Sequence, residues 1–170
     1  MGCGTHDRIA MDRYDKAQDA SYQRYLHGSI SEAKQALYQM LTNAEKHRGK
    51  FLKYYHGEKW EVSLTYGRLA LIAEYEGDQA NAKMFWDVAV EAQLEYQKDE
   101  RAWARATPDV WVPNQDSDVY ERVSPDALRK FLAALERKKD IAWKRQKQND
   151  QTQQVTPPSS GSVPATSGTK

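Results

Sequence analysis

Apolar side chains along this chain recur every three or four residues, which is the spacing of one face of an α-helix. The pattern is clearest after Ser29, where a stripe of alanine, leucine and methionine runs to about His47. Similar stripes cover four further stretches, at 9–26, 60–76, 79–104 and 124–143. No stretch alternates apolar and polar residues for long enough to predict a strand. The pattern therefore predicts an all-α domain over residues 9–146.

Capping signals mark the beginning of two of these helices. Ser29 is followed three positions later by Glu32, which is a capping-box pattern. Ser124 precedes Pro125, and proline favours the first helical position because it has no N–H to leave unpaired. Both helices should therefore begin at these serines.

Composition changes at both ends of the chain. Residues 1–8 are polar and contain glycine, so we expect a flexible N-terminal arm. Residues 147–170 are mostly Gln, Thr, Ser, Pro and Gly, which bury too little apolar surface to offset the entropy of ordering. We expect this tail to be disordered.

The charge balance argues against some classes of function. The 25 Lys and Arg residues nearly cancel the 24 Asp and Glu residues, so no global field attracts nucleic acid or an anionic membrane. No apolar run approaches the length of a membrane span. The single cysteine excludes an internal disulfide framework and a thiolate metal cluster.

Two glycines divide the helices into similar units. Gly28 and Gly77 stand where helices commonly stop. Ala33 and Ala82 follow these glycines at the same offset, and each alanine precedes a lysine. Each unit is therefore a helix, a glycine-containing turn and a second helix, which is an αα-hairpin.

The second unit combines large and small residues at fixed positions: Tyr66, Leu69, Ala70, Gly77, Ala82, Trp86 and Ala89. Over residues 60–95 this set resembles a tetratricopeptide repeat (TPR), and residues 13–45 resemble it more weakly. In such repeats, small residues let antiparallel helices approach closely while bulky neighbours fill the gaps. Ala73, Gln79 and Leu94 stand where the family has tyrosine, an aromatic residue and proline. A generic antiparallel helical bundle is the alternative, because its helices also pack small residues against large ones.

The resemblance implies stacked αα-hairpins with an additional C-terminal helix and a concave groove that receives a peptide or a helix of another protein. The positions that would line this groove are Gly67, Leu71 and Glu74, with Gln18, Tyr22 and Tyr25 in the weaker unit. The alternative is that they are packing residues. Leu71 is apolar where peptide-binding repeats usually carry a polar residue, which favours a groove filled in cis by the 124–143 helix.

Catalytic and metal-binding patterns are not found in the sequence. His6, His27, His47 and His56 have no second histidine or carboxylate at metal-ligand spacing. There is no phosphate-binding loop and no nucleophile elbow. We therefore expect a protein that is not an enzyme, with no catalytic residue, cofactor or metal.

Residues 46–60 mix basic side chains with Tyr54, Tyr55 and Trp60. Interleaved basic and aromatic residues can bind single-stranded nucleic acid. Acidic residues flank the segment, however, and exposed Tyr and Trp are favoured at protein interfaces. We expect a protein contact here and no nucleic acid, and keep nucleic-acid binding as the weaker alternative.

Cys3 lies between two glycines at the front of the chain. Gly2 and Cys3 resemble the end of a bacterial lipobox, whose cysteine becomes lipidated. This resemblance implies an envelope protein that meets the outer membrane only through a lipid anchor at Cys3 and faces the periplasm; the alternative is a cytoplasmic protein.

The sequence thus predicts a TPR-like scaffold that binds another protein or peptide. The alternative is an assembly subunit, a helical bundle that forms a homo-oligomer through the 124–143 helix.

Overall fold

Helices make up nearly all of the described part of the chain. The structure is a computed structural model that describes residues 3–47, 57–106 and 123–146. These ranges contain no strand, so the predicted all-α class is confirmed for them. The helices are α1 (Cys3–His27), α2 (Ile30–His47), α3 (Gly57–Glu76), α4 (Gln79–Ala106) and α5 (Pro125–Glu136). A short helical segment follows at 142–146.

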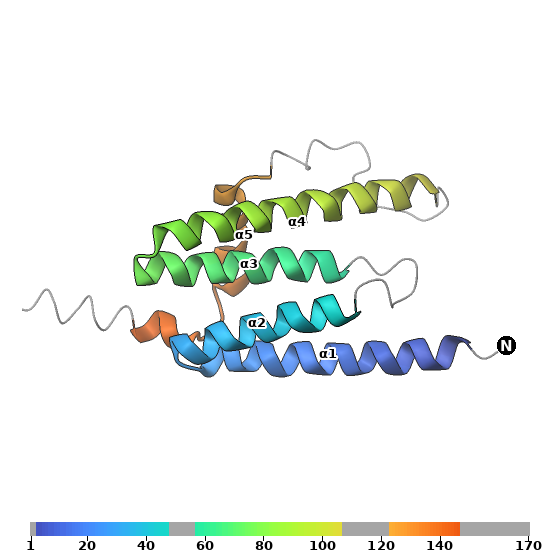
Figure 1. Ribbon diagram of the computed structural model, residues 1–170, viewed down its shortest axis with the longest axis horizontal. Helices are drawn as coiled ribbons and strands as arrows, with labels where there is room; N and C mark the ends of the chain where they lie inside the picture. Colours follow the sequence, from blue (N-terminus) through green and yellow to red (C-terminus); the bar gives the residue numbers. More distant parts are fainter. Residues whose placement is uncertain (1–2, 48–56, 107–122, 147–170) are drawn as a thin grey trace, which may run out of the picture.

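The first four helices lie side by side in chain order, with α1 and α4 at the two edges (Figure 1). Two short links, Gly28–Ser29 and Gly77–Asp78, join α1 to α2 and α3 to α4. Each linked pair packs together as a helical hairpin, and α2 packs against α3. Helix α5 crosses this array and contacts α3 and α4 (Figure 1).

The predicted caps are present. The Glu32 carboxylate accepts hydrogen bonds from the Ser29 N–H and hydroxyl, both at 2.8 Å, which completes the capping box. These hydrogen bonds lower the pKa of Glu32. The Ser124 hydroxyl accepts from the Ala127 N–H at 3.2 Å, with Pro125 at the start of α5. Gly77 has a φ of +79°, the left-handed conformation that lets α3 stop within one residue.

Two helices begin earlier than expected. Helix α1 begins at Cys3 and α3 at Gly57, so both start earlier than the stripes at Ile9 and Trp60 indicated. No proline interrupts either extension, and the cost of one glycine, about 1 kcal/mol relative to alanine, is small enough for an already formed helix to continue past it. Residues 3–8, which we expected to form an arm, therefore belong to α1. The predicted tail at 147–170 lies outside the described residues.

The last predicted helix, 124–143, is divided in two. Helix α5 ends at Glu136, and the chain turns before the segment at 142–146. The turn lets Ile141 and Trp143 become buried, at 2% and 3% exposure. Burial of two large apolar side chains outweighs one further turn of solvent-exposed helix.

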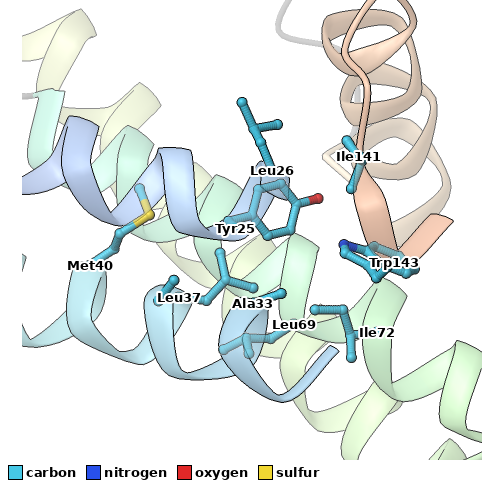
Figure 2. Packing of buried hydrophobic residues seen from close by; sticks show 10 residues of the cluster. Tyr25, Leu26, Ala33, Leu37, Met40, Leu69, Ile72, Ile141 and Trp143 are labelled. Atoms are coloured by element: carbon cyan, nitrogen blue, oxygen red, sulfur yellow. The ribbon is translucent and has the colours of Figure 1, made fainter. Parts of the chain in front are cut away.

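Two clusters of buried residues form the core. The first joins α1, α2, α3 and the segment after α5, and Figure 2 shows Tyr25, Leu37, Ile72 and Trp143 converging in it. The second joins α3, α4 and α5 and consists of Leu64, Ala70, Trp86, Ala89, Leu128 and Leu132. Helix α3 contributes to both clusters and is therefore the central element.

Small residues lie where α3 meets α4. Ala70, Ala82 and Ala89 are all buried. The Ser63 hydroxyl donates a 2.9 Å hydrogen bond to the Ala89 carbonyl on the neighbouring helix. A side chain this short reaches another backbone only where two helices approach closely. Among the other residues predicted for this packing, Leu69 and Trp86 are buried and Tyr66 is half-buried.

Candidate functional site

Helix α5 lies on the surface that the sequence predicted as a groove. Gly67, Leu71 and Glu74 are on α3, while Gln18, Tyr22 and Tyr25 are on α1. We call the surface formed by Tyr25, Gly67, Arg68, Leu71 and Glu74 the α5 seat. Helix α5 of the same chain covers this seat at Gly67, Glu74 and Tyr25.

Gly67 forms a notch for a leucine of α5. A Cβ atom at Gly67 would lie 2.7 Å from Cδ1 of Leu132 and 3.3 Å from Cζ3 of Trp86. Leu132 is 1% exposed and Leu128 is 6% exposed. Burying each leucine stabilises the docked helix by about 1.5–3 kcal/mol before ordering entropy is subtracted. The absence of a side chain at Gly67 therefore admits α5 at this distance.

Glu74 connects α3 to α4 and α5. Its Oε1 accepts a 2.7 Å hydrogen bond from Nε1 of Trp86 on α4. The same oxygen accepts from Arg129 on α5. The Arg129 guanidinium also lies 4.9 Å from the centre of the Trp86 ring, a cation–π distance. Glu74 and Trp86 thus hold Arg129 at the edge of the α5 seat.

A buried ion pair holds the end of α5. Nε of Arg68 donates to Oε1 of Glu136 at 2.8 Å, and the two side chains are 6% and 1% exposed. The Tyr25 hydroxyl lies 3.2 Å and 3.1 Å from the two oxygens of Glu136. Nζ of Lys144 donates to Oε2 at 2.8 Å. One carboxylate therefore collects donors from α1, α3 and the segment after α5.

The charged form of Glu136 is favoured despite its burial. Burial raises the pKa of this carboxyl, but Arg68 and Lys144 lower it further, so the net pKa lies below its ordinary value. Burial and the Glu136 charge together raise the pKa of Tyr25. The tyrosine hydroxyl therefore stays protonated and remains a donor. The guanidinium of Arg68 also lies over the Tyr22 ring, 4.9 Å from its centre.

Gln18 belongs to a separate polar cluster, about two helical turns before Tyr25 on α1. Its amide donates to the Tyr14 hydroxyl and to Glu61, both at 3.0 Å, and it accepts from Asn43 at 3.3 Å. It is 5% exposed. Gln18 therefore joins α1, α2 and α3, which is the packing role left open as the alternative to partner binding.

The segment at 46–60 falls largely outside the described residues, and Tyr54 and Tyr55 lie there. Trp60 is half-buried in α3. Its ring packs edge-on against Phe131 of α5, with 5.1 Å between the ring centres, and its centre lies 5.6 Å from that of the Tyr96 ring. Trp60 therefore contacts α5 and α4.

A second, open groove runs over α3 between α2 and α4. Two hollows of about 730 and 390 Å³ share Tyr66. The first is lined by Leu41 and Val62 among others, and the second by Tyr38 and Met84, which are 47% and 49% exposed. Val62 and Tyr66 lie about half a helical turn from Gly67 and Leu71. The groove therefore occupies the side of α3 opposite the α5 seat.

Sequence reasoning did not identify Arg68, Glu136 or the open groove. Glu136 begins the charged run ERKKD, which is typical of a solvated helix face. Two features of the sequence could have indicated them. Arg68 lies within the apolar stretch of α3, which suggests a buried charge, and Tyr38 and Met84 are large apolar residues off the buried stripes of their helices.

The described residues show neither a metal-binding cluster nor a membrane-spanning helix. They contain no group of three or more His, Cys, Asp or Glu side chains arranged to hold a metal ion. None of the described helices is both long enough and apolar enough to cross a membrane. Cys3 is the first residue of α1.

Comparison with known proteins gives no match: no family model fits the chain, and no curated protein or solved structure is significantly similar to it.

The buried pair predicts a large loss of stability when one partner is removed. In Glu136→Gln, Arg68 stays buried without a counter-charge, so the free energy of unfolding should fall by about 3–5 kcal/mol. The control is Glu76→Gln, which removes a pair with Lys34 whose side chains are 35% and 38% exposed. This control should lose less than about 1 kcal/mol. Urea unfolding followed by circular dichroism measures both, and equal losses would contradict the assignment.

The lowered pKa of Glu136 predicts acid sensitivity. A carboxyl whose pKa is lower in the folded state stabilises the fold above its unfolded-state pKa of about 4.3 and loses this effect as pH falls through the folded-state pKa. The stability difference between wild type and Glu136→Gln should therefore be full near pH 7 and shrink below about pH 4. Urea unfolding of both chains at several pH values measures it. A difference that is constant with pH would refute the prediction.

Proposed function

We propose that this chain is a non-catalytic scaffold that binds another protein, with its two helical hairpins stacked in the manner of TPRs. One observation carries the proposal: the surface chosen from the TPR resemblance receives an amphipathic helix, α5. That helix places Leu132 over Gly67 and Glu136 on Arg68. A surface with a small-residue notch and a buried cation is suited to a helix, because it supplies both apolar contact and a fixed register.

A lipid anchor at Cys3 is the second part of the proposal. Cys3 begins α1, and the α5 seat involves the opposite end of that helix, at Tyr25. An acyl chain at Cys3 would hold the start of α1 at the envelope membrane. The seat would then lie several helical turns from the lipid surface.

An assembly subunit is the second candidate function. Phe131 and Leu135 of α5 are 40% and 46% exposed, which leaves apolar area for another copy of the chain. In that case the partner is a second copy of this chain.

Photocrosslinking tests the proposed function. The photoreactive residue p-benzoylphenylalanine replaces Tyr22, which neighbours the α5 seat, or Tyr38, which lines the open groove. We expect an adduct with a different protein from position 22 and little from position 38 in native cells. Adducts with a second copy would favour the assembly subunit. Adducts from position 38 alone would move the binding surface to the open groove, and no adduct from either position would contradict the scaffold.

Lipidation is tested on the chain expressed from its own gene in its own cells. The wild type should fractionate with membranes and gain mass at Cys3, because an acylated cysteine binds a bilayer. Cys3→Ser should be released to the soluble fraction. A soluble wild type without added mass would refute the anchor.

A further inference from the structure

We propose that α5 is a releasable occupant of its seat, and that the helix which replaces it carries two leucines and a carboxylate at the spacing of Leu128, Leu132 and Glu136. The inference rests on the proposed protein-binding function and names the partner chemistry of that site. These three α5 residues stand four apart and therefore share one helix face.

Helix α5 buries few of its residues. It has 12 residues, of which only Leu128, Leu132 and Glu136 are buried. A helix of this length is marginal by itself in water. The α3–α4 contact, by contrast, buries three alanines, Trp86 and a hydrogen bond between the two helices. Opening of α5 alone therefore removes a small share of the core and leaves both hairpins packed.

The seat selects the chemistry of any replacement. The Gly67 notch accepts a leucine side chain and lies against Trp86. The next residue of α3, Arg68, is 5% exposed, and a guanidinium buried without a counter-charge is strongly unfavourable. A replacement helix with a neutral side chain at the position that Glu136 occupies in α5 would leave Arg68 unpaired. The partner therefore carries Asp or Glu there.

A tether keeps α5 close to its seat after release. Ile141 and Trp143 are anchored in the other core cluster with Tyr25 and Ile72. Because this anchor is independent of the leucine contacts, a released α5 stays at high effective concentration. A separate helix must then bind more tightly than α5 does, which makes the seat selective against weak ligands.

Peptide binding to the full chain tests the inference. The probe is a fluorescein-labelled synthetic peptide with the sequence of residues 124–137. It is titrated into Leu132→Ala, which weakens docking of α5, and into Leu135→Ala, the matched control at a 46% exposed leucine of the same helix. We expect at least about tenfold tighter binding to Leu132→Ala, since a larger fraction of that chain has an open seat. A peptide carrying Glu136→Gln should bind at least about tenfold more weakly.

Equal peptide affinity for the two variants, or no binding to either, would overturn the inference. Hydrogen exchange on the wild type keeps the test valid if Leu132→Ala does not fold. Amides of α5 should exchange at least about tenfold faster than those in the middle of α3, through an opening that leaves α3 folded. Equal protection in both helices would mean that α5 leaves only on global unfolding, which also overturns the inference.

Light scattering identifies the occupant. A wild type that stays monomeric at high concentration supports a separate partner helix. A wild-type dimer that Leu132→Ala dissociates would assign the seat to α5 of a second copy and overturn the inference. The two proposals fail separately. Adducts from position 22 without peptide selectivity would leave the scaffold function and remove this inference. Selective peptide binding without any adduct would support the selectivity of the seat and contradict the scaffold function in cells.

Discussion

The arrangement of the C-terminal part depends on one buried carboxylate. Glu136 receives donors from Tyr25 on α1, Arg68 on α3 and Lys144 beyond α5. Buried ion pairs add little net free energy compared with apolar residues, but a mispaired alternative is strongly unfavourable. The pair therefore acts mainly on specificity. It fixes the register of α5 on α3 and the point at which the chain turns, and that turn brings Trp143 into the core cluster shared by α1, α2 and α3.

Local features of the fold were accessible from the sequence because their causes are local. The caps at Ser29 and Ser124 depend on residues within one helical turn, and the glycine stop at Gly77 depends on one dihedral angle. The pairing of Arg68 with Glu136 is different. These residues are far apart in the sequence, and no periodicity connects them. A charged run such as ERKKD has the same pattern whether its first residue faces water or a buried guanidinium.

The candidate site could be predicted only in part, because some of its contacts join residues that are far apart in the sequence. The TPR resemblance implied that Gly67 and Leu71 line a groove on α3, and the structure places α5 against these residues. Gln18 on α1 was assigned to the same groove, yet its hydrogen bonds tie it to Tyr14 and Glu61. A side-chain amide surrounded by its own chain is indistinguishable in sequence from one that awaits a ligand.

The order of the elements along the chain has a consequence during synthesis. A ribosome completes α1 to α4 before it adds the residues that cover α3. Until Glu136 emerges, the guanidinium of Arg68 has no carboxylate from α5, and the notch at Gly67 faces solvent. The nascent protein therefore passes through a stage in which both hairpins can pack while this surface is open to chaperones or to a partner that is already present.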